Sequence, residues 1–258
     1  MKATKYLIVV LVGLSLLWIG CEEEPSESLE APTNLRVTSV EPDGTTLNLA
    51  WTASQTSDVD GYYVYFDDSL ITELSSTATS YQLPTDRLGE IGVSAFRGGE
   101  ESAKAILNTE DELVYGNSGG PIYWENDETP GHYSGFGWDE DGTGAIYSLV
   151  SEYKPYIDIY VDSDFDLGSP TNISGWEDAH STGFCWDFTS ASSLDDVTNV
   201  AGADFSHTYA DIYEGAIYVL ELQSGNYVKI KVVGVNETDH SIQLEYYFMA
   251  IPDYAIMY

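Results

Sequence analysis

Short runs in which apolar and polar residues alternate are the main pattern along this chain of 258 residues. In the first half they lie between Gly, Pro, Asp and Ser residues, at positions 35–37, 47–51, 63–66 and 91–95. Because successive side chains of a strand point to opposite faces of a sheet, a period of two residues predicts half-buried β-strands. The same stretch shows no sustained helical period. The pattern therefore predicts a sandwich of short strands.

Further alternating runs occupy the second half, at positions 145–149, 156–161, 216–220, 227–233 and 242–248. The last three runs are separated by Gln-Ser-Gly-Asn at 223–226 and by Asn-Glu-Thr-Asp at 236–239, both favourable turn sequences. Strands joined by such short turns pair in chain order as an antiparallel meander. We therefore predict an all-β protein in which an N-terminal sandwich is followed by a second antiparallel β-rich domain.

Several motifs of the first domain resemble the fibronectin type III family: APTNL at 31–35, LAW at 49–51, GYYVY at 61–65 and GEES at 99–102. The resemblance covers about residues 31–108. It implies two packed sheets with Trp51 between them, and a role as a spacer or adhesion module. The chain departs from the family near Leu88 and Ile91, where a tyrosine often ties the corner between two strands.

The composition changes after Asn108 and becomes rich in glycine at positions 116–121. Such a change is typical of a domain boundary. We therefore place a linker at residues 109–116 and the second β-rich domain at residues 117–258.

The first residues follow a different pattern. Lys2 and Lys5 precede an apolar run at 6–19, which is typical of a secretion signal and shorter than the about 20 residues that span a membrane. LWIGC at 17–21 resembles the bacterial lipobox, although Trp18 stands where that family favours a smaller aliphatic residue.

The lipobox resemblance implies that residues 1–20 are a lipoprotein signal peptide and that Cys21 carries the lipids of the mature chain. Residues 21–30 are acidic and poor in apolar side chains, which predicts a flexible tether. We expect a cell-envelope protein held to a membrane by its lipid anchor, most naturally the outer membrane, facing the periplasm or the cell surface. An ordinary signal peptide with an unrelated cysteine is the alternative.

The charge of the chain changes the set of partners to consider. Asp and Glu number 43 against 9 Lys and Arg, and the formal net charge is −34. Nucleic acid and bare anionic membranes are poor partners for such a chain. The acidity serves either solubility or a cation on which some of the carboxylates converge.

One acidic segment has the spacing of a cation site. In Asp162-Ser-Asp164-Phe-Asp166-Leu-Gly168, every second side chain is a carboxylate, and calcium prefers such oxygen ligands. An EF-hand would need glycine at its sixth position and glutamate at its twelfth, where this chain has Leu167 and Ile173. The three aspartates are our candidate calcium ligands, and an acidic turn after a strand is the alternative.

The string GNSGGP at 116–121 resembles the nucleophile loop of trypsin-like serine proteases. Those enzymes place their general-base histidine upstream of the serine, whereas the first histidine here, His132, follows Ser118. We interpret the string as a glycine-rich turn and expect no enzymatic activity. A hydrolase remains an alternative, which would need a histidine or a carboxylate pair poised in a cleft.

The remaining candidates are histidines and aromatic rings. The four histidines lack the short spacing of a metal site: His132, His180, His207 and His240. The C-terminal meander resembles HmuY-like surface lipoproteins, some of which bind haem, but no ligand residue carries over. Some rings are candidates for stacking on sugars or partner surfaces, and core packing is the alternative for each: Tyr133, Phe136, Trp138, Trp176 and Trp186.

Cys185, between Phe184 and Trp186, is expected to be a buried thiol. With no catalytic motif, we predict a binding or scaffolding role towards a carbohydrate, a small ligand or a protein. Uptake of haem or another small ligand is the alternative. No cofactor is expected, apart from the candidate calcium ion.

Overall fold

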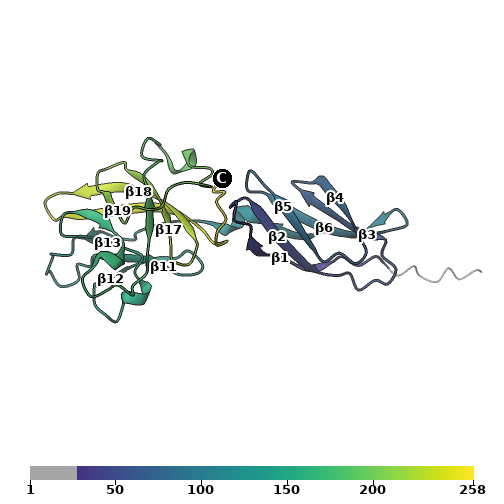
Figure 1. Cartoon of the computed structure of the whole chain (residues 1–258), viewed down its shortest axis with the longest axis horizontal. Coiled ribbons are helices and arrows are strands. Elements are labelled where there is room, and N and C mark those ends of the chain that lie inside the picture. The colour runs from purple at the N-terminus through teal and green to yellow at the C-terminus, as the bar shows by residue number, and fades with distance from the viewer. Residues whose placement is uncertain (1–27) are drawn as a thin grey trace, which may run out of the picture.

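The computed structural model describes residues 28–258, so the predicted signal peptide and Cys21 lie outside the described residues. The described part is all-β, with only short 3-10 turns, and it forms two β-rich halves (Figure 1). In residues 28–258, no helix has the length and hydropathy to cross a membrane. The predicted fold class is confirmed.

The N-terminal half is a sandwich of two antiparallel sheets. One sheet has the order β1-β2-β5, and the other has the order β4-β3-β6-β7, with β8 also paired to β6. The strands are β1 (Thr33–Val40), β2 (Thr46–Thr52), β3 (Gly61–Phe66), β4 (Ser69–Ser75), β5 (Ser80–Pro84), β6 (Glu90–Arg97), β7 (Glu100–Glu101) and β8 (Ala105–Asn108).

Alternation along the strands builds the core of this sandwich. In β2, Leu47, Leu49 and Trp51 are each at most 4% exposed, while the residues between them are half-buried. Trp51 packs against Tyr62 of the facing sheet, with ring centroids 5.9 Å apart. A two-sheet sandwich with a tryptophan in its core is therefore present, as the sequence predicted.

The second half contains two further antiparallel sheets. One has the order β10-β19-β18-β17-β15, with β9 also paired to β19, and the other has the order β12-β11-β13-β14-β16. The strands of the first are β9 (Leu113–Asn117), β10 (Ile122–Tyr123), β15 (Gly183–Cys185), β17 (Ile217–Glu221), β18 (Tyr227–Asn236) and β19 (Ser241–Met249). Those of the second are β11 (Gly135–Trp138), β12 (Gly144–Tyr147), β13 (Ile159–Val161), β14 (Asp166–Gly168) and β16 (Tyr209–Asp211).

The core of this half contains side chains of both sheets, such as Phe136 and Leu167 from one and Ile230 and Phe248 from the other. The meander β17-β18-β19 pairs in chain order, with the two predicted turns between its strands. Four short 3-10 turns complete the fold: η1 (Thr109–Glu112), η2 (Lys154–Tyr156), η3 (Pro170–Asn172) and η4 (Leu194–Asp196).

The segment 109–116, expected as a linker, has regular structure. Thr109 is fully buried, and its backbone N–H donates to the carbonyl of Gly89 at 3.0 Å. Strand β9 begins at Leu113 and pairs with β19, where a Cβ on Gly116 would lie 2.3 Å from the Tyr246 hydroxyl. The glycine that suggested a linker is thus required by close packing inside a sheet.

The last residues of the chain join the two halves. Tyr254, Ile256 and Met257 are fully buried in a core cluster that also contains Leu47 and Val93 of the sandwich. Such shared burial favours a fixed arrangement of the two halves over free movement about a linker.

The corner that lacks the family tyrosine is tied by a tyrosine from this C-terminal segment. The hydroxyls of Tyr254 and Thr85 lie 2.6 Å apart, and the backbone N–H of Leu88 donates to the carbonyl of Tyr258 at 2.7 Å. Gly44 accepts from the N–H of Ala255, and its φ of +71° is a conformation that favours glycine.

A buried lysine holds the C-terminal segment from the other side. Lys229 is 1% exposed, and its Nζ donates to the carbonyls of Val197 at 3.0 Å and Met257 at 2.9 Å. Burial lowers the pKa of Lys229 to about 8. The two carbonyls compensate part of the cost of removing its amine from water.

The chain enters the sandwich at the end that faces away from the second half. Glu30 binds Thr56 and Ser54, which follow strand β2, whereas Gly44, which precedes β2, contacts the C-terminal segment. The seven residues of β2 therefore separate the two ends by about 20 Å (Figure 1).

We predict that Tyr254→Ala lowers the free energy of unfolding by about 3–5 kcal/mol, because it leaves a cavity between the two halves. Tyr254→Phe should lower it by about 1 kcal/mol, through loss of the hydroxyl contact with Thr85. Urea unfolding followed by tryptophan fluorescence measures both. Tyr258, which is 68% exposed, supplies the control Tyr258→Ala, and an equal effect of the two alanine variants would contradict the account.

Candidate functional site

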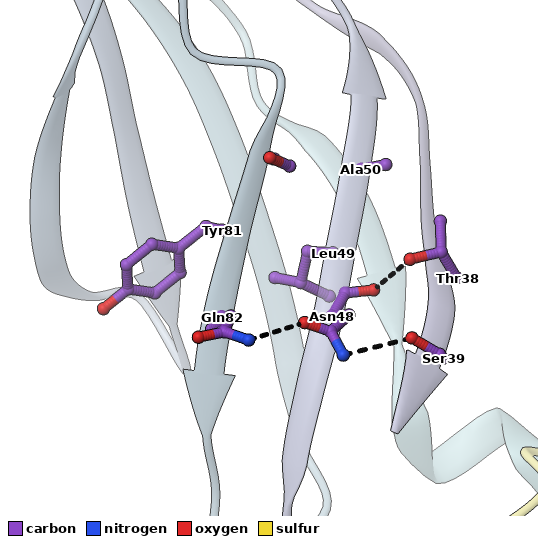
Figure 2. A pocket seen from close by; sticks show the side chains of 8 residues that line it. Thr38, Ser39, Asn48, Leu49, Ala50, Tyr81 and Gln82 are labelled. Carbon is purple, nitrogen blue, oxygen red and sulfur yellow. Dashed lines mark hydrogen bonds between the residues drawn. The ribbon is translucent and has the colours of Figure 1, made fainter. Parts of the chain in front are cut away.

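One surface hollow lies on the sheet β1-β2-β5, with a volume of about 760 Å³. Figure 2 shows its polar side chains in a row across the three strands. Asn48 Nδ2 donates to Ser39 Oγ at 3.0 Å, and Gln82 Nε2 donates to Asn48 Oδ1 at 3.1 Å. Both amides also donate to the carboxylate of Glu41. Because these groups satisfy one another, a ligand would have to replace existing hydrogen bonds.

A second hollow, of about 440 Å³, lies between the two halves. Its walls are mainly apolar and include Val37, Val40 and Ile251, with Arg36 and Glu112 among the charged lining residues. Few polar groups are available there to orient a small ligand.

A third hollow, of about 510 Å³, belongs to the second half and combines aromatic, cationic, anionic and amide groups. Its lining residues are Ser151, Lys154, Pro155, Gly175, Trp176, Asp178, His180 and Gln223. They come from three segments: the loop around η2, the loop that follows η3, and the turn between β17 and β18. Ligand sites commonly have this size and a few convergent polar groups. We refer to it as the His180 pocket and take it as the candidate site.

A buried carboxylate fixes the central histidine of this pocket. Asp158, directly before β13, is 4% exposed, and its Oδ1 lies 2.9 Å from Nδ1 of His180. Its Oδ2 accepts the backbone N–H of Trp138 in β11 at 2.9 Å. The Asp158 carbonyl accepts the Thr182 hydroxyl at 2.5 Å. Both carboxylate oxygens are thus bonded, and the imidazole is held in one orientation against the sheet.

The same carboxylate favours the protonated form of His180. Its hydrogen bond to Nδ1 raises the pKa of His180 above the ordinary value of 6.5, while burial opposes the rise. With Nδ1 facing Asp158, the Nε2 edge of the ring is the one left for a ligand. The His180 side chain is 36% exposed and lines the pocket.

An ion pair lies beside the histidine. Lys154 Nζ binds Asp178 Oδ1, and the lysine side chain is 17% exposed against 84% for the aspartate. The ammonium group lowers the pKa of Asp178. The lysine therefore belongs to the wall of the pocket, whereas its counter-ion lies at the mouth.

Aromatic rings complete the pocket and its surroundings. Trp176 is half-buried in a series of tight turns, and its backbone N–H donates to the carbonyl of Ile173 at 3.0 Å. Beside η2, Tyr147 stacks on Tyr156 with ring centroids 6.0 Å apart, and Tyr153 lies 5.8 Å from Tyr147. Tyr156, which follows the lining residue Pro155 in the chain, is 57% exposed.

The predicted calcium ligands do not line this pocket: Asp162 and Asp164 lie in the turn between β13 and β14, and Asp166 is the first residue of β14. Asp162 Oδ1 accepts the N–H groups of Asp164 and Asp166, both at 2.9 Å. Phe165 has a φ of +65°, which the turn requires. Burial, followed by the charges of Asp162 and Asp211, raises the pKa of Asp166. Asp162 therefore stabilises the turn by accepting backbone hydrogen bonds, as the aspartate of an Asx motif does.

Across residues 28–258, no group of three or more His, Cys, Asp or Glu side chains is arranged to hold a metal ion. Calcium binding at these aspartates stays a prediction.

The other sequence candidates have structural contacts. Ser118 is buried, and its Oγ donates to Gly120 O at 2.7 Å and accepts Leu244 N–H at 3.2 Å. Cys185 is fully buried, and burial raises the pKa of its thiol, as expected for a core cysteine. Phe136 and Trp138 belong to the core, whereas Tyr133 is 43% exposed.

The three histidines outside the pocket each stack on an aromatic ring. His132 lies 3.5 Å from the Tyr123 centroid, His240 lies 4.3 Å from that of Trp124, and His207 lies 3.8 Å from that of Trp186. Of the rings considered for stacking on ligands, Trp176 is the one that lines the His180 pocket.

Sequence reasoning missed the pairing of Asp158 with His180, which are separated by 22 positions. One signal was present: Asp158 interrupts the apolar run Tyr-Ile-Asp-Ile-Tyr-Val at 156–161. A carboxylate within an otherwise apolar strand needs a partner, because burying an unpaired charge is unfavourable.

Comparisons with known proteins add little to this geometry. No family model and no curated protein matches the chain. Among solved structures, the Clostridium perfringens spore cortex lytic enzyme SleM is 25% identical over 31% of this chain and 28% of that chain, with a TM-score of 0.26. The central fibronectin-III array of RIM-binding protein is 10% identical over 85% of this chain and 69% of that chain, with a TM-score of 0.28. At these TM-scores neither similarity bears on function.

We predict that His180 makes the stability of the protein depend on pH. Its pKa is higher in the folded state than in the unfolded one, so its contribution is complete below pH 6.5 and is lost as the pH rises through the folded-state value. Relative to His180→Gln, the wild type should lose about 0.5 kcal/mol or less from pH 5.5 to 8.5, since solvent screens the partly exposed ring.

Urea unfolding at four pH values measures this difference. Both proteins keep Lys229, whose lowered pKa acts in the opposite sense, stabilising the fold as the pH rises above about 8. Subtracting the free energy of unfolding of His180→Gln from that of the wild type removes the Lys229 contribution, which the two proteins share. If the stability of the wild type relative to His180→Gln instead increased with pH, the raised pKa of His180 would be contradicted.

We also predict that Asp162→Ala lowers the free energy of unfolding by about 1–2 kcal/mol without calcium, because two backbone N–H groups lose their acceptor. Asp164→Ala, a change at the same turn that leaves this acceptor in place, should have little effect. Thermal melting in calcium and then in chelator tests the calcium prediction. A calcium-dependent rise in Tm that Asp164→Ala abolishes would establish a cation site, and an unchanged Tm would overturn it.

Proposed function

We propose that this chain is a lipid-anchored cell-envelope protein whose second domain binds a carbohydrate in the His180 pocket. The observation that carries the proposal is the convergence of the Trp176 ring with donors and acceptors on one hollow, around a histidine that Asp158 holds in place. The fibronectin-like sandwich then serves as a spacer.

The chemistry of the pocket suits a sugar. Sugar hydroxyls both donate and accept hydrogen bonds, while the C–H face of a sugar ring packs on an aromatic ring. Lys154 supplies donors, and the hydroxyl of Ser151 can both donate and accept. Gln223 Oε1 accepts the N–H of Ser181 at 3.0 Å, which leaves the Gln223 amide NH₂ for a ligand.

The course of the chain supports the role of the sandwich as a spacer. A tether at residues 21–30 would connect the lipidated Cys21 to the end of the sandwich where Glu30 binds Thr56. The second domain packs at the opposite end. A ligand pocket carried there would be held away from the membrane surface, at the outer membrane in the periplasm or outside the cell.

Haem uptake, implied by the resemblance to HmuY-like lipoproteins, has less support. Of the pocket residues, His180 is the one imidazole, and its Nδ1 already faces Asp158. A hydrolase has less support as well, because Ser118 is buried elsewhere and hydrogen-bonded to the backbone. A binding role is therefore the function we propose.

We predict that Trp176→Ala weakens carbohydrate binding at least tenfold, a loss of about 1.4 kcal/mol or more, because the ligand loses its stacking surface. The experiment screens residues 22–258 on a glycan array and measures the best ligand by calorimetry. Trp186→Ala is the matched control, since Trp186 is half-buried and stacks on His207 outside the pocket. Unchanged binding by Trp176→Ala, or no glycan bound at all, would contradict the proposal.

A further inference from the structure

We propose that the carbohydrate of the His180 pocket is acidic, and that its carboxylate is held between the ammonium group of Lys154 and the Nε2–H of His180. This inference rests on the proposed function and adds the class of ligand. Three features of the pocket support it.

The first feature is the placement of positive charge. The whole chain has 9 Lys and Arg against 43 Asp and Glu, so most of its charged side chains would repel a carboxylate. Lys154 lines the His180 pocket and is 17% exposed, and His180 supplies a second cation when it is protonated. N–H donors with positive charge are the usual complement of a carboxylate, and two residues of this pocket can supply them.

The second feature is the carboxylate that the pocket already holds. Asp178 binds Lys154, but its side chain is 84% exposed at the mouth, on the loop between η3 and β15. Solvent screens an ion pair whose carboxylate is this exposed, so an incoming carboxylate can replace Asp178 at little loss. Asp178 therefore occupies the position at Lys154 that we assign to the acid group of the ligand.

The third feature is the orientation of His180. Asp158 is hydrogen-bonded to Nδ1, so Nε2 is the nitrogen left for a ligand. The protonated ring has an N–H at Nε2, whereas the neutral ring has a lone pair there that repels a carboxylate. The carboxylate of Asp158, before β13, hydrogen-bonds to the ring, while Lys154 on η2 and Asp178 on the loop that carries His180 line the same pocket. The carboxylate of Asp158 favours the protonated form, so binding should weaken as the pH rises.

The test compares trigalacturonate with its fully methyl-esterified form, which removes the charges and keeps the sugar rings. In 150 mM salt, where the Debye length is about 8 Å and the net charge of the chain is largely screened, calorimetry should give at least tenfold tighter binding of the acid. Lys154→Met should abolish that preference. The preference should also fall between pH 5.5 and pH 8.5.

Asp178→Asn separates the inference from a merely structural effect. If Asp178 competes with the ligand for Lys154, this variant binds trigalacturonate at least threefold more tightly and the methyl ester unchanged. A structural role would instead weaken both, and thermal melting of each variant checks the fold.

Other outcomes overturn the inference in ways that separate it from the proposed function. Equal binding of the two forms, or Trp176-dependent binding of neutral glycans alone, removes the acidic ligand and leaves a carbohydrate site. Failure of every glycan, acidic or neutral, removes both proposals.

Discussion

A single buried carboxylate connects the fold of the second domain to its candidate site. Asp158 is 4% exposed, and removing an ionised group from water is costly unless its oxygens are bonded. The backbone N–H of Trp138 satisfies one oxygen, and Nδ1 of His180 satisfies the other. The loop that carries Trp176, Asp178 and His180 is therefore fastened to strand β11 by the need to compensate this charge. The hydrogen bond from Asp158 is what orients the histidine.

The rest of the architecture presents this site at a distance from the predicted anchor. The C-terminal segment packs Tyr254 and Met257 between the two halves, and Lys229 holds the carbonyl of Met257. The sandwich corner near Leu88 is tied by Tyr254, a residue 169 positions from its partner Thr85. The two halves thus share one hydrophobic cluster, which a spacer needs if it is to hold a binding domain in a fixed direction.

Strand alternation was enough to predict the fold. In β2, every second residue from Leu47 to Trp51 is buried, and the turns at 223–226 and 236–239 separate the strands of the meander as their sequences indicated. Local signals were sufficient there because each strand follows from its own residues. The linker prediction for the glycine-rich segment was wrong because it depended on a distant contact. Gly116 is required by its close approach to Tyr246, a residue 130 positions away that no local pattern reveals.

The site could not be predicted in the same way. Its residues come from loops without periodicity, and the pair of Asp158 and His180 depends on how two segments pack. The regular spacing of Asp162, Asp164 and Asp166 was visible in the sequence, but in the fold Asp162 is used to brace a turn. Spacing along the chain identifies residues that share a turn, whereas convergence on a pocket is a property of the tertiary structure.

The most direct test of the account is a nuclear magnetic resonance titration of the ¹⁵N-labelled protein with the best-binding oligosaccharide. If the ligand binds in the His180 pocket, the signals of the Trp176 indole N–H and the His180 ring nitrogens should shift, with the side-chain amides of Asn48 and Gln82 unchanged. Shifts confined to Asn48 and Gln82 would move the site to the polar hollow of the sandwich in Figure 2 and contradict the account.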